Sequence, residues 1–223
     1  MADRWATFDC YGTLIDWDGG IRATLVRLWP EADEEGLLSR YHEIEPRVQL
    51  EGSPTYRQVL TKGLCLLADA EGLELRPGDE GALAESLPDW PPFSEVPGEL
   101  AELRRRGWRI GILSNADPDL LEASLGRIGE PVDARVTAAD AGSYKPAHGH
   151  WERFRERVGA DPAAHVHVGA SAFHDLGPAG ELGLPAVWIN RLGESSDLPR
   201  AAELPSLAGL ADALDGIRPA GSV

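Results

Sequence analysis

The sequence predicts an α/β fold in which helices flank a parallel β-sheet and a separate helical segment follows the first strand. From about residue 93 onward, short apolar runs that favour β-structure alternate with stretches of helical periodicity. This alternation is typical of a parallel sheet with right-handed crossovers. From residue 20 to about residue 92 the apolar side chains fall at helical spacing instead, which predicts a helical insertion.

The first strand is expected at residues 5–8, an apolar run that ends at Asp9. A tight turn at Gly12 and Thr13 follows directly. A carboxylate held at the carboxyl end of a strand in this way is suited to act as a nucleophile. An Asp in this place can also simply cap or turn the chain, so the later segments must decide between the two interpretations.

The helical segment is expected to form four helices, because its periodicity is broken at Pro30 and at residues 52–54 and 76–78, which contain Pro and Gly. Four more strands are expected at residues 108–113, 134–138, 165–168 and 186–190. Ligands of parallel sheets bind at the carboxyl ends of the strands. A helical segment inserted after the first strand is placed to close over that edge as a cap.

Composition limits the kinds of partner. The 223 residues suit one core domain with one modest insertion. A net charge of -16 argues against nucleic-acid and membrane surfaces, so local positive groups must attract an anionic substrate. Two cysteines are too few for a disulfide framework, and there is neither a cationic leader nor an apolar stretch of membrane length. We therefore expect a cytoplasmic protein.

Three segments follow Asp9 in an informative order: Ile-Gly-Ile-Leu-Ser-Asn at 110–115, Ser-Tyr-Lys-Pro at 143–146, and Val-His-Val-Gly-Ala-Ser-Ala-Phe-His-Asp at 166–175. Together with Asp9 they resemble the four motifs of the haloacid dehalogenase superfamily. Those motifs are an Asp nucleophile, a Ser or Thr, a Lys, and an acidic loop after the fourth strand. Four ordered motifs are far more specific than any one of them, and the resemblance covers nearly the whole chain.

Within that superfamily the details are most similar to the type II 2-haloacid dehalogenases. The similarity comes from Tyr11, from the Leu-Ser-Asn run of the second motif, and from Val-Trp-Ile-Asn-Arg at 187–191. The resemblance implies a Rossmann-like three-layer core domain at 1–15 and 92–223, with a helical cap domain inserted at 16–91.

Most relatives of this fold transfer phosphoryl groups, and two positions argue against that chemistry here. Phosphatases of the superfamily carry a second Asp two residues after the nucleophile, and an acid in the fourth motif that helps to bind magnesium. Tyr11 and Ala170 stand at these positions. Losing a carboxylate leaves a poor site for a hard cation, and a halide, unlike an alkoxide, leaves without a general acid. We therefore expect neither a metal nor a cofactor.

By resemblance, Asp9 displaces halide from a small 2-halocarboxylate and forms an ester, which water then hydrolyses. Lys145 is expected to keep Asp9 ionised, since a nearby opposite charge lowers the pKa of a carboxyl group. Ser114, with the backbone amides beside it and beside Tyr11, is expected to hold the substrate carboxylate. Asn115 resembles the residue that, in this family, is a hydrogen-bond donor on the halide side of the substrate.

Each of these assignments has a plainer alternative. Arg40 resembles the cap arginine that reaches the halogen, but Arg47 is a rival, and a solvated helix face explains either of them. Lys145 is also explained as a solvated surface lysine. Ser114 and Asn115 are also suited to the N-terminus of a helix that starts near Asp117-Pro118, and both roles are compatible.

The departures from the type II pattern concern the hydrolysis of the ester. Ala170 and Ala172 replace polar residues of the fourth motif, which leaves Ser171 and Asp175 to orient or activate water. Trp151 stands where the family has a tyrosine, and we place it with the substrate-binding residues.

Histidines near these motifs offer a substitute base. His174 lies beside Asp175 and has a suitable ordinary pKa, although loop histidines are commonly structural. His165 and His167 alternate along a strand and share a face. One of them is interpreted as an edge or core residue, and no third ligand at metal spacing follows.

Three functions of different classes remain. The first is a metal-independent hydrolase of the 2-haloacid dehalogenase type. The alternatives are a magnesium-dependent phosphatase with rearranged ligands and a non-catalytic binder of small carboxylates. All three imply a small anionic ligand and no nucleic-acid or membrane partner, and the oligomeric state is left open, with a homodimer as one option.

Overall fold

The structure is a computed structural model that describes residues 3–52 and 54–219. The chain divides into two compact units. One, which we call the sheet unit, takes in Met1–Ile15, Pro92–Asn115 and Ile128–Val223, and the other, the helical unit, takes in Asp16–Pro91 and Ala116–Arg127. The core and cap domains expected from the sequence stay a prediction. The segment 116–127 groups with the helical unit, although the sequence analysis assigns it to the core domain.

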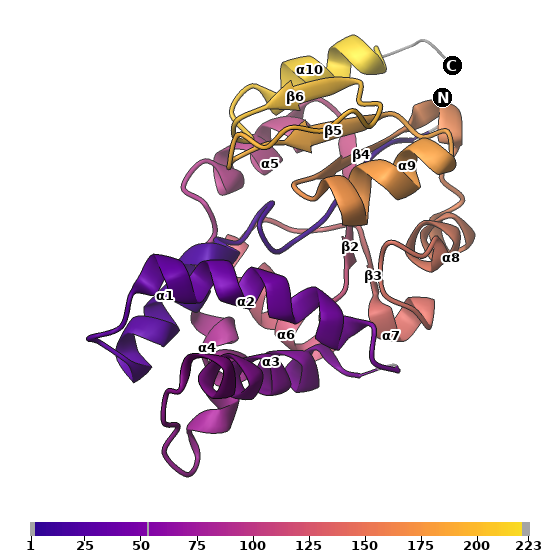
Figure 1. Cartoon of the computed structure of the whole chain (residues 1–223). Helices are drawn as coiled ribbons and strands as arrows, with labels where there is room; N and C mark the ends of the chain where they lie inside the picture. The colour runs from indigo at the N-terminus through magenta and orange to yellow at the C-terminus, as the bar shows by residue number, and fades with distance from the viewer. Residues whose placement is uncertain (1–2, 53, 220–223) are drawn as a thin grey trace. The chain divides into compact units, whose positions relative to one another are not determined.

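Within the described residues, the sheet unit contains six parallel strands in the order β3-β2-β1-β4-β5-β6 (Figure 1). The strands are β1 Arg4–Phe8, β2 Trp108–Ser114, β3 Ala134–Thr137, β4 His165–Gly169, β5 Ala186–Ile189 and β6 Ala202–Leu204. The predicted α/β class with a parallel sheet is confirmed. The sequence analysis does not predict β6, because three partly or fully exposed residues give no periodicity to detect.

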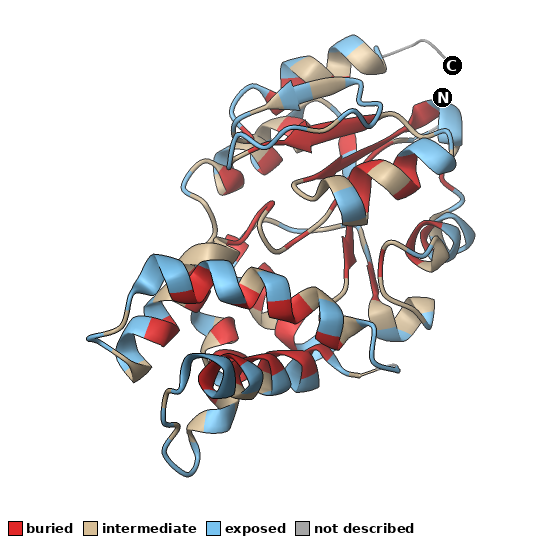
Figure 2. Cartoon of the chain, viewed as in Figure 1, coloured by how far each residue is buried: buried red, intermediate tan, exposed pale blue. Residues whose placement is uncertain are grey.

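The sheet is covered by helices, and its inner strands are buried. Strands β4 and β5 are buried along their whole length (Figure 2). A strand that is covered on both faces carries a continuous apolar run rather than an alternating one, as β5 does. Helices α5, α7 and α8 pack against β2 and β3. The helices of this unit are α5 Val96–Arg105, α7 Ala138–Ala141, α8 Gly149–Val158, α9 Gly177–Glu181 and α10 Leu210–Ile217.

The strand order reverses beside β1. The chain passes from β1 to β2 and β3 on one side, and then returns to place β4 on the other side of β1. Ligands of open parallel sheets bind at such a switch point, outside the carboxyl ends of the strands. The segments directly after β1, β2 and β4 are therefore the place to look for a site.

The helical unit packs its helices around a shared apolar core. Its helices are α1 Trp17–Leu28, α2 Glu34–Gln49, α3 Tyr56–Glu71, α4 Ala82–Ser86 and α6 Pro118–Ile128, the last residue of which falls in the sheet unit. Helices α2 and α3 lie side by side (Figure 1). Leu38 on α2 and Leu60 and Leu64 on α3 are buried. Burying each such side chain contributes roughly 1.5–3 kcal/mol.

The N-terminus of α3 explains why the segment 116–127 belongs to the helical unit. Thr55 and Gln58 form a capping box there, each side chain bonding to the other residue's backbone N–H. The carboxylate of Asp117 accepts two more hydrogen bonds, from the backbone N–H groups of Tyr56 and Arg57, both at 3.0 Å. The residue just before α6 thus satisfies donors that a helix start leaves without intrahelical partners.

Glu45 on α2 is a buried carboxyl group in this unit, with 5% of its surface exposed. It accepts a hydrogen bond from the side chain of Gln49. Burial raises the pKa of Glu45 to about 7, although Gln49 and His42 act in the opposite direction. The folded protein therefore retains a proton that the unfolded chain has already released near neutral pH.

We expect Glu45→Gln to remove a pH dependence of stability. Because the pKa is raised on folding, the contribution of Glu45 is fully present below the ordinary Glu pKa and is lost as the pH rises through 7. The wild-type free energy of unfolding should fall relative to the variant by roughly 3 kcal/mol between about pH 4 and pH 8. Urea unfolding at both pH values measures this. Glu43→Gln, on an exposed part of the same helix, is the control and should follow the wild type.

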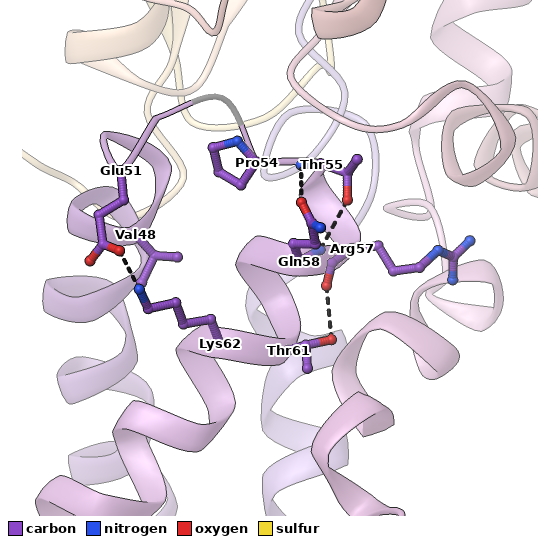
Figure 3. Close-up of a pocket in the computed structure, with 8 residues that line it drawn as sticks. All are labelled: Val48, Glu51, Pro54, Thr55, Arg57, Gln58, Thr61 and Lys62. Atoms are coloured by element: carbon purple, nitrogen blue, oxygen red, sulfur yellow. Dashed lines mark hydrogen bonds and ion pairs between the residues drawn. The ribbon is translucent and has the colours of Figure 1, made fainter.

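A pocket of about 700 Å³ lies in the helical unit between the end of α2 and the start of α3 (Figure 3). Its polar groups bond to one another: Lys62 pairs with Glu51, and Thr61 donates to the carbonyl of Arg57. An active-site pocket is recognised by polar groups that converge on its interior and are free to bind a ligand, and the volume of the pocket alone is a weaker criterion. We therefore place the candidate site at the sheet. No helix in residues 3–52 and 54–219 is long and apolar enough to cross a membrane.

Candidate active site

Asp9 leaves the sheet directly after β1, and two side chains hold its carboxylate. Its Oδ1 accepts a hydrogen bond from Lys145 Nζ at 2.8 Å, and its Oδ2 accepts one from Thr13 Oγ1 at 2.9 Å. The backbone N–H of Asp9 donates to the carbonyl of Val168 on β4 at 3.0 Å. The side chain of Asp9 keeps 14% of its surface exposed, so the carboxylate is fixed but reachable.

The loop after Asp9 folds back on the carboxylate. Gly12 has a φ of 85°, a conformation that strains residues with a side chain. The turn returns Thr13 to Asp9, where its hydroxyl donates to the carboxylate and accepts the backbone N–H of Ala170 at 2.9 Å. Thr13 therefore joins the loop after β1 to the loop after β4.

Lys145 lies in the loop between α7 and α8, with 2% of its surface exposed. Asn115, which follows β2, holds its backbone on both sides. Asn115 Oδ1 accepts from Lys145 N at 2.7 Å, and Asn115 Nδ2 donates to Lys145 O at 3.2 Å. The structure thus brings these two predicted site residues together, with Asn115 positioning Lys145. The role of Asn115 on the halide side stays a prediction.

Asp175 lies in a short π-helical turn after β4 and is fully buried. Its Oδ1 accepts from Lys145 Nζ at 2.7 Å and from His167 Nε2 at 3.2 Å. Its Oδ2 accepts from the backbone N–H of Ser171 at 3.1 Å. Gly169 makes room for this arrangement, because a Cβ atom there would lie 2.4 Å from Cγ and from Oδ2 of Asp175.

One ammonium group is shared by two carboxylates. Burial raises the pKa of Asp9, the charge of Asp175 adds to the increase, and the opposing effect of Lys145 does not cancel it. Burial raises the pKa of Asp175 as well, but Lys145 and His167 outweigh this effect and hold that pKa well below its usual range. Burial lowers the pKa of Lys145, yet the two carboxylates outweigh it and the pKa is raised. The expected lowering of the Asp9 pKa by Lys145 is therefore one contribution to a pKa that is raised overall.

Three other predicted residues lie around this cluster. Ser114 ends β2, is buried, and its carbonyl accepts from His150 Nε2 at 3.0 Å. Tyr11 lies in the loop after Asp9, where it forms a β-bridge with Ile15. Ser171 Oγ lies 3.2 Å from Nδ1 of His174. Contacts of these residues with a substrate stay predictions.

Two predicted residues remain, Trp151 and Arg40. Trp151 is buried in a core cluster of the sheet unit, with its ring 5.1 Å from that of His167. Arg40 belongs to α2 of the helical unit, is exposed, and forms ion pairs with Glu43 at 2.7 Å and Glu71 at 3.6 Å. Their roles toward a substrate are untested and stay predictions.

Sequence reasoning missed two side chains that contact the cluster. The sequence analysis gives Thr13 only as part of a turn, although a hydroxyl four residues after an Asp is the available signal. It interprets one of His165 and His167 as an edge or core residue and does not predict the contact of His167 with Asp175. The available signal was that His167 belongs to the strand that leads into the loop of Asp175.

The fold and the site define a class: α/β enzymes in which acidic and basic side chains meet where the central strands end. The family model of the haloacid dehalogenase-like hydrolases matches residues 4–183, and the chain belongs to that family. The prediction of this family from the four motifs is confirmed.

Individual relatives agree with this membership. The chain is 29% identical over 191 residues to the (S)-2-haloacid dehalogenase of Pseudomonas sp. (strain YL), covering 83% of this chain and 82% of that protein. It is 27% identical over 195 residues to (S)-2-haloacid dehalogenase 4A of Burkholderia cepacia, covering 85% and 84%. The structure of the L-2-haloacid dehalogenase from Xanthobacter autotrophicus with chloropropionic acid covalently bound shares the fold, with a TM-score of 0.84, 21% identity and coverage of 96% and 99%.

Proposed function

We propose that the protein is a metal-independent hydrolase that displaces halide from a small 2-halocarboxylate through an ester on Asp9. One observation carries the proposal: Lys145 Nζ lies 2.8 Å from Asp9 Oδ1 and 2.7 Å from Asp175 Oδ1. The carboxylate that we propose as the nucleophile, a cation and a second carboxylate thus share one hydrogen-bonded cluster. The names of the Pseudomonas and Burkholderia relatives, and the covalently bound chloropropionic acid in the Xanthobacter enzyme, support this chemistry.

In the first half of the reaction, a carboxylate oxygen of Asp9 attacks C2 of the substrate. A carbon–oxygen bond forms while the carbon–halogen bond breaks, and the halide leaves with its electron pair. No proton is transferred in this step. Thr13 and Lys145 hold Asp9 in one orientation, which lowers the entropic part of the barrier.

In the second half, water attacks the carbonyl carbon of the Asp9 ester and gives a proton to Asp175. The tetrahedral intermediate collapses, and the 2-hydroxy acid leaves after its alkoxide oxygen takes that proton back. Asp9 retains one oxygen from water and releases the other water proton to solvent. Lys145, 2.8 Å from Asp9, is placed to stabilise the negative charge of the intermediate.

We assign the recognition of the substrate to the residues predicted from the sequence. Ser114 and the amides near it and near Tyr11 hold the substrate carboxylate, and Asn115 and Arg40 serve the halide. Trp151 takes the place of the family's tyrosine, and Ser171 helps to orient water. With a net charge of -16 on the chain, these local donors must outweigh the repulsion of an anion.

The donor set fits magnesium poorly. Among residues 3–52 and 54–219, no group of three or more His, Cys, Asp or Glu side chains is arranged to hold a metal ion. A cation between Asp9 and Asp175 would compete with the ammonium of Lys145, which both carboxylates already bind. A hard divalent ion also needs more oxygen ligands than this pair supplies.

Incubation of the chelator-treated protein with chloroacetate tests the proposal. We expect halide release that neither chelator nor added magnesium changes, together with no phosphate release from p-nitrophenyl phosphate. Phosphate release that requires magnesium, without halide release, would identify a phosphatase. Binding of chloroacetate without any turnover would identify a carboxylate binder, and either result would overturn the proposal.

A further inference from the structure

A row of buried polar side chains runs from Asp175 into the sheet. His167 Nε2 lies 3.2 Å from Asp175 Oδ1, and His167 Nδ1 lies 3.0 Å from the hydroxyl of Thr7. The same hydroxyl lies 2.8 Å from Nε2 of His165. All four residues are buried, with at most 4% of their surface exposed. Buried polar groups are costly unless they are paired, so this row needs an explanation.

The strand register produces the row. His165 and His167 alternate along β4 and so lie on one face of the sheet, while Thr7 is the residue of β1 paired with His167. Aromatic rings of α8 cover this face: Trp151 lies 5.1 Å from the His167 ring and Phe154 lies 5.5 Å from the His165 ring. The row is therefore closed off from water and ends at Asp175.

An ionised Asp175 only accepts hydrogen bonds, so Nε2 of His167 is the donor in its bond to Oδ1. The Thr7 hydroxyl lies within hydrogen-bond distance of Nδ1 of His167 and of Nε2 of His165, and its role in each bond depends on the tautomers of the two rings. The His167 ring is thus held between Asp175 and Thr7.

The surroundings of Asp175 explain why such support matters. Within its own turn, the backbone N–H of Ser171 is a donor to the carboxylate at 3.1 Å, whereas Ala170 and Ala172 have no side-chain donors. When Asp9 becomes an uncharged ester, Asp175 is left as the carboxylate partner of Lys145. A second donor at Oδ1 then resists any rotation of Asp175 toward the ammonium group.

We infer that His167 is a positioning residue for the hydrolysis of the ester, holding Asp175 in the orientation in which it accepts the proton of the attacking water. The inference rests on the proposed function and adds a residue to its second half. Because His167 contacts Asp175 and not Asp9, its removal should slow hydrolysis of the ester and leave halide displacement unchanged.

The test compares two amides at position 167. In His167→Gln the side-chain NH₂ reaches the place of Nε2 and can donate to Asp175, whereas in His167→Asn it ends near Nδ1 and cannot. Loss of a hydrogen bond to a charged group corresponds to about 10- to 100-fold in rate. We expect steady-state halide release from chloroacetate to fall by this factor in His167→Asn and to stay within about 3-fold of wild type in His167→Gln.

Rapid mixing separates the two half-reactions. His167→Asn should release one halide per active site at the wild-type rate and then turn over slowly, because the ester accumulates. Val166→Ala is the control, since it changes an equally buried side chain of the same strand that lies on the opposite face of the sheet from the row. It should show no burst beyond that of the wild type.

Several results would overturn the inference. These are equal slowing of the burst and of the steady rate in His167→Asn, no slowing at all, failure of His167→Gln to restore turnover, or the same defect in Val166→Ala. Counting active sites by the burst corrects for any misfolded fraction. Wild-type protein that releases no halide would overturn the proposed function itself and this inference with it.

Discussion

Asp9→Asn is expected to lower halide release by about 10⁴-fold or more, as the loss of a covalent nucleophile does in other enzymes. The amide of Asn is nearly isosteric with the carboxylate but is a poor nucleophile. It can still accept a hydrogen bond from Lys145 or Thr13, so the loop after β1 should keep its conformation. Halide release from chloroacetate, measured with the variant at high concentration, gives the residual rate.

The control is Asp197→Asn, which makes the same chemical change at an exposed position of the sheet unit. It should retain wild-type activity. Thermal unfolding of both variants shows whether they are folded. Activity of folded Asp9→Asn close to that of the control would show that the halide is displaced by another group, such as water.

Asp175→Asn should slow the reaction at its second half. Loss of the group that accepts the proton of water is expected to cost about 10²- to 10⁴-fold in steady-state turnover. Displacement of halide by Asp9 remains possible, so a burst of one halide per active site should precede the slow rate. Mass spectrometry of the intact variant should detect protein that carries one substrate fragment. Normal turnover without a burst would show that another group activates water.

The same variant should change the pH dependence of the burst. The negative charge of Asp175 raises the pKa of Asp9, so its removal should lower that pKa. Displacement of halide requires ionised Asp9, and the burst rate is therefore lost as the pH falls through this pKa. In Asp175→Asn that loss should occur at lower pH than in the wild type. Loss of the burst rate at a higher pH in the variant than in the wild type would contradict an arrangement in which Asp9 and Asp175 share the ammonium group of Lys145.

The sequence predicts this fold well because the inner strands are short runs rich in apolar residues, and three of them, β1, β2 and β4, lead into a motif. Asp9, Lys145 and Asp175 could be chosen from these motifs, and the structure places them in one hydrogen-bonded cluster. Strand β6, by contrast, is three partly or fully exposed residues without a pattern. Its place in the sheet depends on pairing with β5, which no local signal reveals.

The supporting contacts of the site were harder to predict, because they depend on distances between segments far apart in the chain. Asn115 holds the backbone of Lys145 across 30 positions of sequence. Thr7 meets His165 and His167 only because β1 pairs with β4 in one register. A shift of one residue would turn these side chains to the opposite face. Such contacts follow from the register of strands, which apolar periodicity alone does not fix.

Covalent participation of Asp9 is the central claim, and a single turnover in water enriched in oxygen-18 tests it most directly. Excess enzyme is mixed with a small amount of chloroacetate, and the product and the peptide that contains Asp9 are then analysed by mass spectrometry. If water attacks the ester carbonyl, the heavy oxygen enters the carboxylate of Asp9, and the glycolate from this first turnover carries none. If water attacks the substrate directly, the label appears in glycolate and the Asp9 peptide stays unlabelled, which would contradict the mechanism.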